Sequence, residues 1–83
     1  MSKEINAAYT RVLRRLRFQK NLSQEQLGFE ADLHRTYISQ LERGLKSPSL
    51  ETVFKLANTL NISVGDLIHL VEDELNEISM ENK

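Results

Sequence analysis

The strongest constraint on the fold of this chain lies in residues 22–44, which predict two short helices joined by a tight turn. Ser23 and Gln26 form a capping box, in which each side chain can bind a backbone N–H group and so start a helix over about 24–31. Asp32 follows, and aspartate accepts the left-handed backbone conformation of a turn more readily than most residues. This stretch therefore predicts two helices packed at an angle rather than the strands of a sheet.

The second helix of the pair is expected over about 35–43, with His34 as its N-cap and Gly44 as its stop. Ile38 and Leu41 lie three positions apart and face inward. The outward side chains can bind base edges and phosphates, and they are Arg35, Thr36, Ser39 and Gln40. Two helices in this arrangement form a helix-turn-helix, whose second helix enters the major groove of DNA.

Three further helices are predicted from apolar residues that recur at spacings of three and four, over about 6–20, 50–60 and 64–78. The last of them is longer than a five-helix domain needs, and its apolar seam is typical of a helix that packs against a partner. The seam residues, expected at a dimer interface, are Ile68, Val71, Leu75 and Ile78. The chain is thus predicted to be one all-α domain over 1–83, with its core over about 6–70 and its C-terminal helix serving dimerisation.

Charge is distributed unevenly along the chain although the formal net charge is only −1. Residues 1–48 carry nine Lys or Arg against five Asp or Glu, whereas residues 49–83 carry two against seven. A basic half can face DNA phosphates while an acidic half stays away from them. The chain has no cysteine, so a reducing cytoplasm is the expected location. No apolar run is long enough for a membrane span, and no membrane partner is expected.

The motif residues resemble those of the lambda-repressor-like, Cro and xenobiotic-response-element (XRE) family of bacterial and phage regulators. The matching residues are Leu22-Ser23-Gln24-Glu25, Leu27, Tyr37-Ile38-Ser39, Leu41-Glu42-Arg43-Gly44, Pro48-Ser49-Leu50, Leu56-Ala57 and Leu60. Within the family, the run from His34 to Ser39 is similar to that of restriction-modification controller proteins. The resemblance implies a compact five-helix DNA-binding domain that acts without a cofactor.

The expected function is that of a sequence-specific regulator of transcription, which binds a near-palindromic operator on double-stranded DNA as a homodimer. The resemblance favours a repressor or autoregulator that blocks RNA polymerase or, in controller-like members, also recruits it. The protein is expected to be bacterial or phage-encoded, and to be associated with the nucleoid when it is bound to DNA.

The resemblance also implies roles for residues outside the base-reading set. Residues expected at the DNA backbone are Gln24, Tyr37, Arg43 and Lys46. In the family an acid at the position of Glu42 pairs with an arginine of the first helix, which is Arg17 in this chain. Such a pair fixes the angle between helices more surely than it adds stability.

The chain departs from the family pattern at two positions near the turn. Asp32 replaces the turn glycine and must accept a left-handed conformation or shift the turn. Gly28 stands where the family has alanine, inside a helix, at a cost in helix propensity of up to about 1 kcal/mol.

No catalytic constellation is expected, and the protein is predicted not to be an enzyme. His34 and His69 are far apart in sequence, and neither has a histidine or cysteine at the spacing of metal ligands or of a nucleophile and its base. A run of acids in the last helix is expected to be a solvated face, and it consists of Glu72, Asp73 and Glu74.

Two other functions stay open at this point. One is an antitoxin-like or adaptor module whose acidic last helix binds a protein partner and whose DNA contact is secondary. The other is a nonspecific nucleic-acid binder, whose affinity would fall as steeply with salt but would show no preference over random DNA.

Overall fold

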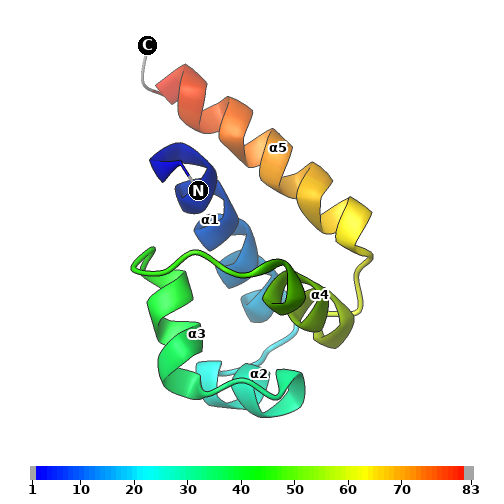
Figure 1. Cartoon of the computed structure of the whole chain (residues 1–83). Coiled ribbons are helices and arrows are strands. Elements are labelled where there is room, and N and C mark those ends of the chain that lie inside the picture. Colours follow the sequence, from blue (N-terminus) through cyan, green and yellow to red (C-terminus); the bar gives the residue numbers. More distant parts are fainter. Residues whose placement is uncertain (1, 82–83) are drawn as a thin grey trace.

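The computed structural model of the chain describes residues 2–81, which fold into five α-helices with no strand among them (Figure 1). The helices are α1 (Lys3–Gln19), α2 (Gln24–Ala31), α3 (Arg35–Glu42), α4 (Leu50–Thr59) and α5 (Val64–Glu81). The prediction of an all-α fold is confirmed. Met1 and residues 82–83 of the predicted 1–83 domain lie outside the described residues.

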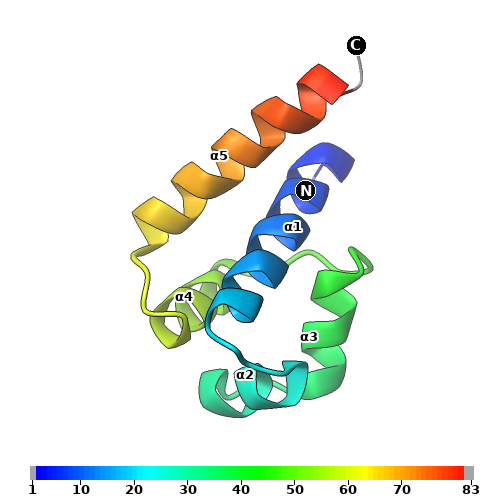
Figure 2. The same cartoon turned by 180° about the vertical axis from the view of Figure 1, so that it is seen from behind.

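The two long helices α1 and α5 run antiparallel and share the most extensive contact between elements. Their outer ends carry both ends of the chain, and α2 lies at the opposite end of the molecule (Figures 1 and 2). α3 and α4 connect these two ends. α2 is therefore presented away from the chain termini, whereas the C-terminal end of α3 lies beside the first turns of α1, where the Asn6 amide donates to the Gly44 carbonyl.

Local capping sets the bounds of the helices. α1 starts at Lys3, earlier than the predicted residue 6, because the Ser2 hydroxyl accepts the Ile5 N–H group at 3.1 Å and caps the first turn. It ends before Asn21, whose φ of 57° is left-handed. Asn61, with a φ of 55°, follows α4 in the same way.

A single apolar core joins all five helices. Its buried members are Ala8, Tyr9, Val12, Leu13, Leu27, Ala31, Ile38, Leu41, Val53, Leu56, Ala57, Leu60, Leu67, Val71 and Ile78. Burial raises the pKa of Tyr9, since its hydroxyl lies in this core without a hydrogen-bond partner among the described residues.

The apolar seam of α5 packs largely within the chain, which corrects the predicted dimer interface. Val71 and Ile78 are only 7% and 6% exposed and belong to the core that α5 forms with α1. Leu75 is half-buried against the same core, and Ile68 is 43% exposed. The 3–4 spacing identified an apolar face, but α1 of the same chain covers most of it. Of the four predicted interface residues, only Ile68 remains well exposed.

The acidic run of α5 is also only partly a solvated face. Glu72 and Asp73 are exposed, whereas Glu74 is buried and pairs with two arginines of α1. Arg11 donates to it at 3.2 Å, and Arg15 forms the shorter bond. The Arg15 hydrogen bond, aided by Arg11, lowers the pKa of Glu74 against the opposing effect of desolvation. Glu74 therefore attaches α5 to α1.

Candidate nucleic-acid interface

The helix-turn-helix is formed by α2, the turn at residues 32–34 and α3. The capping box is complete, since Ser23 Oγ accepts the Gln26 N–H group at 3.0 Å and Gln26 Oε1 accepts the Ser23 N–H group at 2.8 Å. Asp32 is left-handed, with a φ of 58°, as its place in the turn required.

The close approach of the turn to α2 explains why a glycine stands at position 28 despite its low helix propensity. A Cβ atom at this position would lie 2.6 Å from the Leu33 carbonyl oxygen, which belongs to the backbone of the turn. The Leu33 N–H group also donates to the Gly28 carbonyl at 2.7 Å. Gly28 thus allows the turn to approach α2 closely, and the start of α3 lies against the same spot.

The cap of α3 is the side chain of His34. Its Nδ1 atom accepts the Thr36 N–H group at 3.1 Å, which requires that nitrogen to be unprotonated. The helix ends at Glu42, and Gly44, with a φ of 72°, turns the chain away from it. The predicted positions of the two motif helices agree with the structure to within one residue.

α3 has a buried side and a polar outward side. Ile38 and Leu41 are completely buried in the core. Of the four predicted base-reading residues, Arg35 and Thr36 are exposed, and Ser39 and Gln40 are half-buried. All four come from a helix of eight residues, and none of them belongs to the core. The helix therefore presents a short polar face.

The ion pair of Arg17 and Glu42 ties α3 to α1. Arg17 Nε donates to Glu42 Oε2 at 2.6 Å and Arg17 Nη2 donates to Oε1 at 2.9 Å, so the pair is bidentate. The two side chains are only 9% and 3% exposed. Arg17 Nη1 also donates to the Leu22 carbonyl at 2.8 Å, and the Gln24 amide donates to Glu42 Oε1 at 3.2 Å. This cluster connects α1, α2 and α3.

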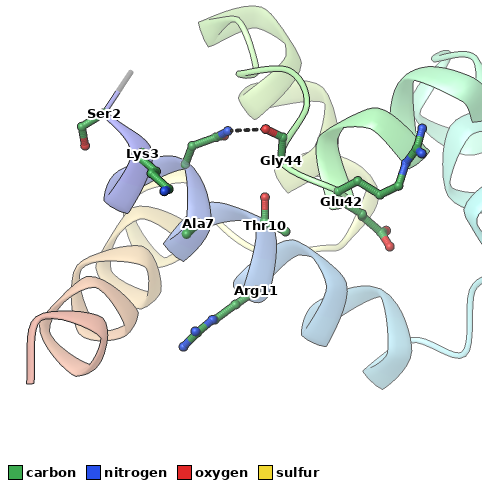
Figure 3. Close-up of a pocket in the computed structure, with 9 residues that line it drawn as sticks. Ser2, Lys3, Ala7, Thr10, Arg11, Glu42 and Gly44 are labelled. Carbon is green, nitrogen blue, oxygen red and sulfur yellow. Dashed lines mark hydrogen bonds between the residues drawn. The ribbon is translucent and has the colours of Figure 1, made fainter. Parts of the chain in front are cut away.

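Two further hydrogen bonds hold the same C-terminal end of α3 against α1, and Figure 3 draws the one to the Gly44 carbonyl. Thr10 Oγ1 donates to the Leu41 carbonyl at 2.9 Å, and the Asn6 amide donates to the Gly44 carbonyl at 3.1 Å. Together with the Arg17–Glu42 pair, these bonds fasten the C-terminal end of α3 to α1. Both donors lie outside the family motif, and neither was singled out from the sequence.

The residues predicted to contact the DNA backbone fall into two groups. Arg43 and Lys46 are exposed, directly after α3. Gln24 and Tyr37 are half-buried and already have partners within the chain, because the Gln24 amide binds Glu42 and the Tyr37 hydroxyl lies 3.3 Å from Thr52 Oγ1. The partner of Tyr37 lies in the first turn of α4, a contact that the sequence did not indicate.

An exposed ion pair in the motif was also missed by sequence reasoning. Arg35 Nη1 lies 2.9 Å from Glu25 Oε2, and the side chains are 63% and 70% exposed. Glu25 belongs to α2 and Arg35 to α3, so the pair spans the turn. Its sequence separation of ten residues follows no helical period, and only the folded turn brings the two groups together.

Metal clusters and membrane spans were the two other features sought in the described part of the chain. Within residues 2–81, no group of three or more histidine, aspartate or glutamate side chains is arranged to hold a metal ion. None of the helices described there is both long and apolar enough to span a membrane.

A capped helix pair with a tight left-handed turn and a polar outward face on its second helix defines a helix-turn-helix DNA-binding domain. Residues 13–67 match the family model described as Helix-turn-helix. The chain belongs to this helix-turn-helix family, and the resemblance seen in its motif residues is confirmed.

Named relatives of similar size include control proteins. The chain is 42% identical over 69 residues to control protein C.BamHI of Bacillus amyloliquefaciens, covering 82% of this chain and 85% of that protein. It is 46% identical over 66 residues to control protein C.SmaI of Serratia marcescens, covering 80% and 75%. Among solved structures, the restriction-modification controller protein C.AhdI of Aeromonas hydrophila superposes with a TM-score of 0.72 at 40% identity, over 75% of this chain and 94% of that one.

Proposed function

We propose that this protein is a sequence-specific DNA-binding regulator of transcription that places α3 in the major groove. The observation that carries the proposal is the polar outward face of α3, held at a defined angle by the buried Arg17–Glu42 pair. A groove-binding helix must present its side chains in a fixed orientation, because donor and acceptor patterns on base edges are read by direct contact. Membership of the helix-turn-helix family and similarity to control proteins support this function.

The four outward residues of α3 have complementary abilities as base readers. Arg35 can bind guanine O6 and N7 with two N–H groups, and Gln40 can bind adenine N6 and N7. Thr36 can offer its methyl group to thymine, and the short Ser39 side chain lets the backbone of α3 approach the bases.

Contacts to phosphates position the protein without reading the sequence. Arg43 and Lys46 are free to make them, since both are exposed in the segment after α3. Gln24 acts mainly as a brace, because its amide donates to Glu42. Tyr37 is placed by Thr52 at the start of α4, where its hydroxyl can still accept or donate a further bond.

The active unit is a homodimer on a near-palindromic operator, with half-sites about one helical turn, or roughly 34 Å, apart. Because most of the α5 seam is buried within the chain, the surface for the second copy is assigned to apolar side chains that stay exposed on α4 and α5. These residues are Leu50, Phe54 and Ile68. Leu50 and Phe54 are four residues apart on α4 and so share one face.

This assignment is tested by sedimentation equilibrium of Phe54→Asp and Ile68→Asp. Each variant is expected to shift the protein toward monomer and to weaken operator binding through lost bivalency. Phe29→Asp is the matched control, since Phe29 is 87% exposed on α2 and lies outside the assigned surface. An unchanged dimer in both test variants would remove this surface from the interface.

The regulated system is proposed to be a restriction-modification locus, in line with the relatives C.BamHI and C.SmaI, which are control proteins, and C.AhdI, a restriction-modification controller protein. Bound upstream of a promoter, the cytoplasmic dimer represses by blocking RNA polymerase or activates by recruiting it. Its own gene is a target, which makes it an autoregulator.

The test is selection of binding sites from random duplex DNA at about 150 mM salt, which suppresses nonspecific phosphate binding. Enrichment of a two-fold-symmetric motif is the expected result, and a search for that motif upstream of genes then tests the regulated system. If no motif is enriched, the helix-turn-helix is a scaffold, and an antitoxin-like or adaptor role becomes the better account.

A further inference from the structure

The exposed ion pair of Glu25 and Arg35 places a carboxylate beside a proposed base-reading residue. Arg35 is the first residue of α3, and its Nη1 atom lies 2.9 Å from Glu25 Oε2 in the first turn of α2. Both side chains are more than 60% exposed, at 63% and 70%, so the pair adds little to stability. Its consequence has to be sought in binding rather than in folding.

The geometry leaves part of the guanidinium available. An arginine has five N–H donors in a planar fork, and only Nη1 is bonded to Glu25. The remaining N–H groups can still address a guanine while the carboxylate restrains the side chain. Restraining a long side chain before binding reduces the entropy that it loses in the complex.

The negative charge of Glu25 also favours base contacts of Arg35 over phosphate contacts. A carboxylate next to Arg35 repels nearby phosphates and offsets the attraction between the guanidinium and any DNA backbone. An unpaired arginine, by contrast, would bind phosphates of every sequence equally well. The carboxylate therefore weakens the contacts that carry no sequence information more than the contact that does.

We infer that Glu25 is a specificity-determining positioning residue, which holds Arg35 toward base edges and away from phosphates. The inference rests on the proposed function, because it takes Arg35 as a base reader. It assigns to an acidic residue of α2 a role in DNA sequence preference that acts through another side chain.

The test compares Glu25→Gln with the matched variant Glu30→Gln. Glu30 also lies exposed on α2, and it forms no ion pair among residues 2–81, so the two changes remove the same charge from the same helix. Binding sites are selected from random duplexes with the wild type. Dissociation constants are then measured for the selected duplex and for a scrambled duplex of equal length at about 150 mM salt.

Glu25→Gln is expected to raise the affinity for the scrambled duplex. The ratio of the affinity for the selected duplex to the affinity for the scrambled duplex should fall about five- to tenfold. Glu30→Gln should change that ratio less than about twofold, and both variants should have the melting temperature of the wild type. Selection repeated with Glu25→Gln should show a weakened base preference at one position of each half-site. Equal effects of the two variants on the ratio would overturn the inference.

The Arg35→Ala background separates this inference from the proposed function. If Glu25 acts through Arg35, adding Glu25→Gln to Arg35→Ala leaves the ratio unchanged. A ratio that still falls shows that Glu25 acts by a route of its own, and the inference is then wrong. If the wild type enriches no motif, the proposed function fails. If Arg35→Ala weakens selected and scrambled duplexes equally, the base-reading role of Arg35 fails.

Discussion

Two arginine–glutamate clusters join α1 to two different helices, α3 and α5, and they differ in how much water reaches them. Glu42 and Glu74 are similarly buried, with side chains 3% and 6% exposed. Arg17, the partner of Glu42, is only 9% exposed, whereas Arg11 and Arg15, the partners of Glu74, are 46% and 49% exposed.

This difference in exposure gives the two clusters different roles: the Arg17–Glu42 pair orients α3, and the Glu74 cluster attaches α5 to α1. A pair in which both charges are buried must keep its bidentate geometry, because any other arrangement leaves a charge without a partner. It therefore fixes the angle of α3. A pair in which the arginines remain in water tolerates small shifts, since water replaces a lost bond. It attaches α5 to α1 without defining an orientation on which base contacts depend.

The largest expected effect is that of Glu42→Ala. The change leaves Arg17 buried without its partner and should lower the free energy of unfolding by about 3–5 kcal/mol, measured by urea denaturation. A stability equal to that of the wild type would contradict the buried pair.

A double variant keeps this test informative if Glu42→Ala fails to fold. Arg17→Met with Glu42→Leu removes both charges and should recover most of the lost stability, because an apolar pair of similar volume avoids the unpaired charge. Its DNA preference should stay impaired, since the bidentate constraint on α3 is gone. Full recovery of both properties would show that the pair does not position the helix.

Gln40→Ala should have the next largest effect, and on DNA binding alone. Loss of one bidentate base contact is expected to cost about 1–3 kcal/mol at a single operator position, with the melting temperature unchanged. Lys46→Ala is the contrast, because a lost phosphate contact weakens all sequences alike and reduces the salt slope by about one. If Gln40→Ala also weakened all sequences alike, its base-reading role would be excluded.

Glu74→Ala is expected to destabilise the chain by about 1–2 kcal/mol, less than Glu42→Ala, because Arg11 and Arg15 return to water. Its base preference in a binding-site selection should match that of the wild type. Glu77→Ala, at an exposed position of the same helix, is the control. A loss as large as that of Glu42→Ala would remove the distinction between the two clusters.

The smallest effect is the pH dependence that Glu74 contributes. The Arg15 hydrogen bond, with help from Arg11, holds the pKa of Glu74 below its ordinary value of 4.5 in the folded state. The resulting stabilisation is complete above about pH 4.5 and is lost as the pH falls through the pKa of the folded state. Melting temperatures of the wild type and Glu74→Gln should therefore differ at pH 7 and converge in acid. A constant difference would contradict the lowered pKa.

Sequence reasoning located the helix-turn-helix well because its signals are local. Ser23, His34 and Asp32 act on backbone groups within three residues of themselves, so their roles follow from neighbours in the chain. The Arg17–Glu42 pair, in contrast, was expected only through the family resemblance. Nothing in the spacing of these two residues indicates that they meet.

The features that differ from the sequence predictions all depend on which segments of the folded chain pack against one another. The seam of α5 was recognised as apolar, but periodicity cannot tell a second copy from α1 of the same chain, and Val71 and Ile78 proved to be core residues. Glu74 was grouped with solvated acids because its arginine partners lie 59 and 63 residues away. Gly28 was counted as a cost because the carbonyl that approaches it belongs to the following turn.

The missing side chain at Gly28 also bears on how this domain could be redesigned. Because a single added carbon would meet the Leu33 carbonyl at 2.6 Å, the contact between α2 and the turn leaves no room for a side chain at Gly28. A library intended to retarget the protein to new DNA sequences can vary the outward face of α3 freely. It should keep Gly28 unchanged, because the contact between Gly28 and the turn sets where α3 begins relative to α2.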